Sequence, residues 1–219
     1  MNRSIGLFGG SFDPPHCGHE TLVREALKYL DLDEVWVIPA GLPVHRNLSG
    51  HANAELRMVW VEAMFSESPN VHVKDWEVSQ SEPVAAIQTI KTFRDVCPDV
   101  VPLWLCGADS FATMKQWVDY PEHQALCNVV VFARAGEAVA EQFLGWKPLS
   151  SEAWRSSQKK GQSVGPGHII WLDVSLPDIS ASNIRGMAAH GKSLKGLVNS
   201  RIRKEIESRY KPGTGETIE

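Results

Sequence analysis

The chain has 219 residues, of which 43% are apolar, and carries a formal net charge of −4 at pH 7. This negative balance argues against a broad nucleic-acid-binding surface, so any phosphate binding must come from local groups. The four cysteines contain no Cys-x-x-Cys pair, which favours free thiols in a reducing compartment. We find no signal-peptide core and no apolar run of membrane-spanning length, and therefore expect a cytoplasmic protein without a membrane partner.

Strand and helix patterns alternate along the chain. The predicted strands are 5–8, 34–38, 71–73, 101–106, 128–133 and 169–172. The predicted helices are 20–29, 54–65, 84–93, 182–190 and 199–210. This alternation predicts an α/β fold, a doubly wound, Rossmann-like parallel sheet with C-terminal helices.

The Ser-, Lys- and Gly-rich stretch 136–167 interrupts this alternation. We interpret it as a surface insertion or a lid within a single domain that spans 1–210. The last residues, 211–219, have the composition of a disordered tail.

The most informative segment is 9–19, which reads Gly-Gly-Ser-Phe-Asp-Pro-Pro-His-Cys-Gly-His between a predicted strand and a predicted helix. Ligands bind at this edge of an open α/β sheet, where glycines allow close approach to a phosphate and a helix N-terminus favours an anion. His16 and His19 share one face of the first helical turn and can become cationic beside an anion. A metal site formed with Cys17 is the weaker interpretation, because three ligands at one tight turn would diverge. We therefore predict a nucleotide-phosphate site and no metal held by the protein.

A second motif, Ile-Ser-Ala-Ser-Asn-Ile-Arg, opens a C-terminal helix at 179–185. Ser180 or Ser182 can simply cap the helix. Two hydroxyls and the Arg185 guanidinium on one helical turn also suit a phosphate. Together with the first motif, this segment is the expected second half of a triphosphate site.

The two motifs resemble those of the nucleotidyltransferase superfamily with the His-x-Gly-His signature, and within it bacterial nicotinate-nucleotide adenylyltransferases. Ser182 stands where that family has Thr, which keeps the hydroxyl. Smaller marks of the family lie at 39–46 (with Val44 in place of a Pro), Arg57, 107–110, Trp117 and Arg134. The resemblance covers about 5–134 and 177–210.

This resemblance implies transfer of AMP from ATP to the phosphate of nicotinate mononucleotide, a pyridine mononucleotide, giving deamido-NAD and pyrophosphate. The catalytic residues it implies are His16, His19 and Arg185. The implied ATP-binding residues are Gly9, Gly10, Ser11, Phe12, Gly18, Gly107, Asp109, Ile179, Ser180 and Ser182. The implied acceptor-binding residues are His45, Arg46, Trp117 and Arg134, with Trp117 either stacked on the pyridine ring or packed in the core. Mg²⁺ is expected to be held mainly by the ATP phosphates and water, with Asp13 as an outer-shell partner.

One departure leaves the acceptor open. The family has Ser-Tyr-Thr before a helix where this chain has Val84, Ala85 and Ala86. Nicotinamide mononucleotide, another phosphate acceptor within the superfamily, and a non-catalytic nucleotide-binding relative therefore stay as alternatives. Residues 186–193 also fit the phosphate-loop pattern Gly-x-x-x-x-Gly-Lys-Ser, but they follow a predicted helix where that motif needs a strand, and Gly191 is predicted to cap the helix.

Overall fold

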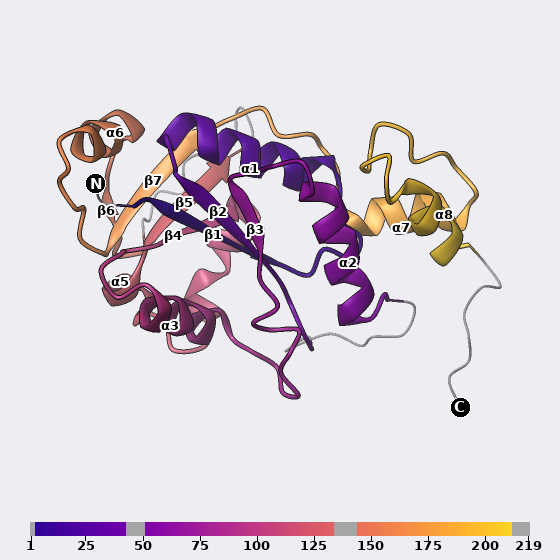
Figure 1. The fold of residues 1–219 in the computed structure, drawn as a ribbon, viewed down its shortest axis with the longest axis horizontal. Coiled ribbons are helices and arrows are strands. Elements are labelled where there is room, and N and C mark those ends of the chain that lie inside the picture. The colour runs from indigo at the N-terminus through magenta and orange to yellow at the C-terminus, as the bar shows by residue number, and fades with distance from the viewer. Residues whose placement is uncertain (1–2, 43–50, 134–143, 212–219) are drawn as a thin grey trace.

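The computed structural model describes residues 3–42, 51–133 and 144–211. Its centre is a seven-stranded sheet in the order β3-β2-β1-β4-β5-β7-β6, with every neighbouring pair parallel (Figure 1). The strands are β1 (Ile5–Gly10), β2 (Glu34–Pro39), β3 (Val71–Val73), β4 (Leu103–Gly107), β5 (Asn128–Ala133), β6 (Lys147–Pro148) and β7 (His168–Asp173). The strand order reverses between β1 and β4, which is where such sheets open a crevice for ligands.

Helices cover both faces of the sheet (Figure 1). They are α1 (Cys17–Leu30), α2 (Ala54–Phe65), α3 (Ala86–Val96), α4 (Ala108–Ala112), α5 (His123–Leu126), α6 (Ser151–Lys159), α7 (Ala181–Ala189) and α8 (Arg203–Arg209), with a 3-10 turn at Met114–Gln116. One apolar core joins a sheet face to α1, α2, α6, α7 and α8, and the other joins the opposite face to α3 and α4. None of the helices in the described ranges is long and apolar enough to cross a membrane.

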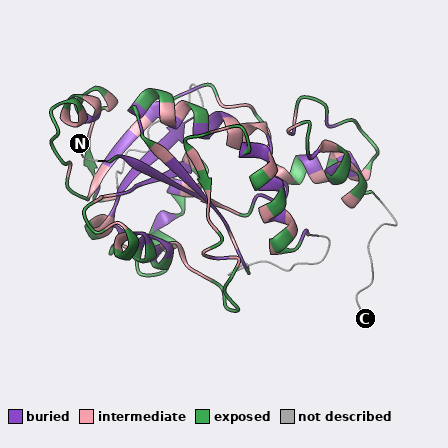
Figure 2. Ribbon diagram, viewed as in Figure 1, coloured by how far each residue is buried: buried purple, intermediate pink, exposed green. Residues whose placement is uncertain are grey.

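Alternate residues of each central strand enter opposite cores. In β2, Val35 and Val37 face the core with α1 and α2, whereas Trp36 and Ile38 face the core with α3. A strand covered on both faces reads as a continuous apolar run, because neither face meets water. Figure 2 shows these strands as the buried centre of the molecule.

The fold class predicted from the sequence is confirmed, and α2, β3 and β5 have the predicted bounds. Helix α1 begins at Cys17, three residues before the predicted start, because His16 is extended and acts as the N-cap residue. The short helices α4 and α5 were not predicted, since four or five residues carry too little periodicity.

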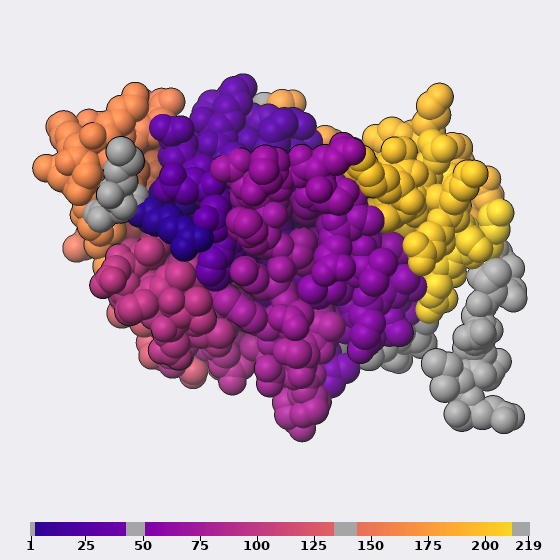
Figure 3. All heavy atoms as spheres, in the orientation of Figure 1, coloured from indigo at the N-terminus to yellow at the C-terminus, as the bar shows by residue number. Residues whose placement is uncertain are grey.

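Part of the irregular stretch 136–167 belongs to the sheet and its helical cover. β6 pairs with β7, and Trp154 of α6 is buried and donates its indole N–H to the Leu30 carbonyl at 3.0 Å. In Figure 3 this segment forms the orange end of the molecule, and α7 and α8 form the yellow end. Residues 136–143 of the stretch and 212–219 of the expected tail lie outside the described residues.

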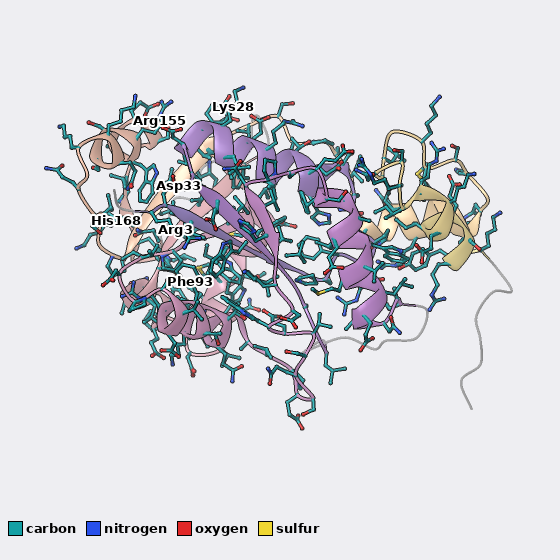
Figure 4. All side chains as sticks on the ribbon, viewed as in Figure 1. Arg3, Lys28, Asp33, Phe93, Arg155 and His168 are labelled. Carbon is teal, nitrogen blue, oxygen red and sulfur yellow. The ribbon has the colours of Figure 1, made fainter. Side chains whose placement is uncertain are left out.

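The amino ends of the strands form the edge opposite the candidate site. Arg3 and Asp33 precede β1 and β2, and His168 begins β7; Figure 4 labels all three on one side of the sheet. The Asp33 carboxylate accepts from the Ser4 amide at 2.7 Å and from its hydroxyl at 2.9 Å, which ties these two strand starts together. The candidate site lies at the opposite edge of the sheet, where the carboxyl ends of the strands meet.

Candidate functional site

The loop from β1 to α1 is shaped by glycines and by strained backbone. A Cβ on Gly9 would lie 2.9 Å from the Trp104 ring, so only glycine lets that indole pack against β1. Phe12 has a φ of 47°, an uncommon conformation for a bulky side chain. Its ring stands edge-on to His19, with ring centroids 4.9 Å apart. Phe12 thereby helps to set the position of His19.

His16 and His19 form a stacked pair at the N-terminus of α1. Their ring centroids lie 3.7 Å apart, and the His16 backbone N–H donates to His19 Nδ1 at 3.1 Å. A Cβ on Gly18 would come within 3.0 Å of His16 Nδ1, which explains the glycine between them. Because Nδ1 of His19 accepts a hydrogen bond, its proton must lie on Nε2 in the neutral ring.

Both histidines are neutral in the ligand-free protein. Burial lowers the pKa of His16 to about 4, and burial together with the nearby His16 lowers the pKa of His19 well below its ordinary value. Two N–H donors at a helix N-terminus therefore await an anion, which would in turn raise both pKa values. The sequence-based expectation of cationic rings applies only when such an anion is bound.

The second motif lies against the first. Ser180 caps α7 by accepting from the Asn183 amide at 3.2 Å. Arg185 donates to the Ser182 hydroxyl at 3.2 Å and to the backbone carbonyl of Asp13. The guanidinium thus joins the start of α7 to the loop before α1, although the two are more than 170 positions apart.

Two adjoining cavities meet at this junction. One, of about 480 Å³, is lined by Ser11, His16, Gly18, His19, Leu22, Gly107, Ala108, Asp109, Phe132, Leu176, Pro177, Ile179, Ser180, Ala181, Ser182 and Arg185. The second, of about 810 Å³, shares Ser11, His19 and Asp109 with it and extends to Trp104 and Trp117. We call them the phosphate cavity and the ring cavity. Their lining residues come from both sides of the β1–β4 switch point.

The predicted site residues that the structure describes are brought together in these cavities. Gly9, Gly10, Phe12 and Trp117 line the ring cavity; the predicted serines, Gly18, Ile179 and the three catalytic candidates line the phosphate cavity, and Gly107 and Asp109 line both. Trp117 is half-buried against Trp104, with ring centroids 6.2 Å apart, so it both packs and faces the cavity. His45, Arg46 and Arg134 lie outside the described residues.

Asp13 has a different place from the one expected. Its carboxylate is buried, accepts from the Ala52 amide, Tyr210 and His51, and lines neither cavity. Burial opposes ionisation, but the hydrogen bonds from Tyr210 and His51 outweigh it and lower the pKa of this carboxyl. The carboxylate is thus held by protein donors behind the cavity lining, and its expected outer-shell role toward Mg²⁺ stays a prediction. Within the described ranges, no three His, Cys, Asp or Glu side chains form a metal site.

The buried Arg57 side chain of α2 braces the loop between β1 and α1 through hydrogen bonds to backbone carbonyls. This buried side chain donates to the carbonyls of Ser11 at 2.6 Å, Gly41 at 2.8 Å and Ala52 at 3.2 Å. From the sequence it was only a family mark, because its three partners are backbone atoms of distant segments. Its geometry makes it a support for the phosphate cavity.

Two buried titratable groups in the ring cavity escaped sequence reasoning. Glu77 accepts from the Thr89 hydroxyl at 2.6 Å, and burial raises its pKa to about 7. His123 stands in the same cavity wall. Neither belongs to a local motif, so only the fold could show that they face the site.

The residues 186–193 that fit the phosphate-loop pattern do not follow a strand. They comprise the end of α7 and the turn after it, where Gly191 has a φ of 66°. This matches the predicted helix cap, and they line neither the phosphate nor the ring cavity. The cavity that suits a nucleotide lies instead at the loop with His16 and His19.

The chain is similar to known proteins over most of its length. The sequence matches the cytidylyltransferase-like family over residues 7–187. A Chromobacterium violaceum protein named "probable nicotinate-nucleotide adenylyltransferase" is 31% identical over 205 residues, which cover 92% of this chain and 95% of that protein. A Thermotoga maritima protein of the same name is 32% identical over 206 residues, covering 94% and 92%.

The fold has a solved counterpart. The nicotinic acid mononucleotide adenylyltransferase of Plasmodium falciparum, complexed with NaAD, superposes with a TM-score of 0.72 at 17% identity, over 94% of this chain and 95% of that chain. At this identity the likeness shows the shared architecture. On the sequence matches, the chain belongs to the nicotinate-nucleotide adenylyltransferase family of the cytidylyltransferase-like proteins.

Proposed function

We propose that this protein transfers AMP from ATP to the phosphate of nicotinate mononucleotide, releasing pyrophosphate and forming deamido-NAD in NAD biosynthesis. The observation that carries the proposal is the junction of His16, His19 and Arg185 in one cavity that opens into a second cavity walled by Trp104 and Trp117. A triphosphate fits the polar half, and a pyridine ring fits the aromatic half.

The proposed chemistry needs no general base. The phosphate of the acceptor is already ionised at neutral pH, so the protein must position two anions and neutralise the charge that builds on the α-phosphate. His16 and His19 line the phosphate cavity, which supports a role for their rings at the α-phosphate, and Ser11, Ser182 and Arg185 of the same cavity hold the β- and γ-phosphates. The amides of Cys17 and His19 already donate to the carbonyls of Leu197 and His16, so the N-terminus of α1 contributes mainly its helix dipole.

We further propose Mg²⁺ as the metal, held by the ATP phosphates and water. This mode suits an ion that keeps several waters and uses few protein ligands. Binding of the ion through phosphate oxygens and water needs no direct ligand from Asp13, whose carboxylate oxygens already bond to Tyr210, His51 and the Ala52 amide. The ion supplies charge neutralisation on the pyrophosphate leaving group when bound.

For the acceptor, Trp117 offers a stacking surface, and the backbone amides at the start of α3 offer donors to a carboxylate. His45, Arg46 and Arg134 keep the acceptor-binding role that the resemblance implies. A cytoplasmic location fits both the substrates and the four free cysteines.

Nicotinamide mononucleotide is the second candidate acceptor, because the Glu77 carboxyl in the ring cavity disfavours a carboxylate once it ionises. The test is pyrophosphate release from ATP and Mg²⁺ with each mononucleotide in turn. We expect the larger kcat/KM with nicotinate mononucleotide. Larger kcat/KM with nicotinamide mononucleotide would reassign the acceptor, and no release with either would leave a nucleotide-binding protein without this activity.

A further inference from the structure

His123 is a buried histidine without a hydrogen-bond partner. Only 1% of its surface is exposed, and neither ring nitrogen has a partner among the described residues. Unsatisfied buried polar groups are rare in native proteins because each one costs stability. Such a group needs an explanation, and a bound ligand is one.

The place of His123 indicates which ligand. It lines the ring cavity beside Trp117, whose ring centroid lies 5.9 Å away at an interplanar angle of 65°. The neighbouring cavity wall at the start of α3 consists of Ala85 and Ala86, which offer no polar side-chain atom. A flat ring stacked on Trp117 projects its in-plane substituents toward the cavity walls, and His123 provides a polar side chain there.

The charge state of His123 favours hydrogen bonding over ion pairing. Burial lowers its pKa, although Glu122 and Asp119 raise it and Lys91 lowers it further. The other titratable groups that line this cavity are His19, Glu77, Cys106 and Asp109. A neutral imidazole carries one N–H donor, and a bond from this donor is stronger to an anionic oxygen than to a neutral one.

We propose that His123 binds the 3-carboxylate of the pyridine ring through its imidazole N–H and so helps to select the acceptor. This inference rests on the proposed function and deepens it. His123 replaces side-chain support that Ala85 and Ala86 do not give. It acts on binding and leaves the transfer step to the phosphate cavity.

The test compares His123→Leu, which keeps bulk but loses both nitrogens, with His123→Gln, which keeps a donor. Steady-state pyrophosphate release gives KM and kcat for both mononucleotides, and calorimetry gives the affinity for nicotinate mononucleotide without turnover. We expect His123→Leu to raise KM for nicotinate mononucleotide about tenfold or more, with KM for ATP unchanged and kcat within about threefold. His123→Gln should recover most of the affinity. The exposed His72→Leu is the matched control and should change nothing.

Thermal unfolding separates ligand binding from a structural role. His123→Leu removes two unpaired buried polar atoms, so its unfolding temperature should equal or exceed that of the wild type. An unchanged KM and affinity, or an equal loss for both mononucleotides, would overturn the inference while the proposed function stands. Wild-type protein that neither turns over nor binds nicotinate mononucleotide would defeat both.

Discussion

The Tyr210 hydroxyl donates a hydrogen bond to Asp13 Oδ1 at 2.5 Å and joins the end of α8 to the loop before α1. Arg209 strengthens the same junction by donating to the His51 carbonyl at 2.9 Å. Asp13 in turn lies one residue from Phe12, whose ring contacts His19. The end of α8 therefore helps to hold the loop between β1 and α1, which lines the phosphate cavity, although the two lie at opposite ends of the chain.

Replacing Tyr210 with Phe should loosen this loop. The change leaves a buried carboxylate with one donor fewer, so we expect a loss of about 1–2 kcal/mol in unfolding free energy at pH 7 and a higher KM for ATP. The lowered pKa of Asp13 contributes stability above the carboxyl's ordinary pKa, and this is lost as pH falls through the folded value. The stability deficit of Tyr210→Phe should therefore shrink in acid. Denaturant titrations at several pH values measure it.

The control is Tyr29→Phe, because Tyr29 is exposed and its ring lies against the Lys28 ammonium at the surface. It should leave both stability and KM unchanged. Equal stability of Tyr210→Phe and the wild type at pH 7 would show that the Tyr210–Asp13 bond does not support the loop.

Replacing His19 with Ala should abolish turnover while the fold survives. We expect kcat to fall by about 100-fold or more, since one preorganised donor at the reacting phosphate is lost. Circular dichroism should show that the fold survives, whereas the unfolding temperature should fall somewhat, because the His16 backbone N–H loses its acceptor and the rings of His16 and Phe12 lose a contact. His72→Ala serves as the exposed histidine control. Near-normal kcat in His19→Ala would contradict the role given to this pair.

Glu77→Gln should stabilise the protein increasingly as pH rises from about 4.5 to 7, and fully above that range. Burial raises the pKa of Glu77 from 4.5 to about 7, so the folded state binds more protons than the unfolded state between these values. Wild-type stability therefore falls as pH rises from about 4.5 to 7, and the amide avoids this loss. The expected gain is up to about 3 kcal/mol at pH 8 and close to zero at pH 4.

Urea titrations of Glu77→Gln and the wild type at both pH values provide the measurement. The exposed Glu62→Gln should show no such pH-dependent difference. A constant difference between Glu77→Gln and the wild type across this range would mean that Glu77 does not titrate near neutrality.

Two glycine-to-alanine substitutions should change the free energy of unfolding in opposite directions. A Cβ on Gly41 would lie 2.1 Å from the Glu77 carbonyl, so Gly41→Ala must displace backbone and should cost about 2 kcal/mol or more. Gly186 lies inside α7 with open space around its Cα, so Gly186→Ala should gain about 0.5–1 kcal/mol. Chemical denaturation measures both.

Gly186→Ala also tests the phosphate-loop pattern at 186–193. If that segment bound ATP, loss of its first glycine would impair the reaction. We expect unchanged kcat and KM for ATP, because the described geometry assigns these residues to a helix end. A marked rise in KM for ATP in this variant would return the segment to consideration.

Local sequence patterns were enough to predict the architecture and the two motifs that line the phosphate cavity. Buried parallel strands read as apolar runs, and the bounds of α2, β3 and β5 follow from periodicity alone. The motifs at 9–19 and 179–185 are contiguous segments that lead into the first turns of α1 and α7, so a local pattern reveals them. Short helices and the strand β6 lack such a signal, since their stability comes from packing and pairing.

The sequence by itself determined the fold class, the family resemblance and the two motifs at 9–19 and 179–185, because each depends on residues close together along the chain. Only the tertiary structure decided that Asp13 is a buried anchor bonded to Tyr210, that Arg57 supports the loop from below, and that Glu77 and His123 face the ring cavity. These relationships join residues far apart in sequence, and burial sets their pKa values. Neither the partner of a side chain nor its burial is written in its local sequence.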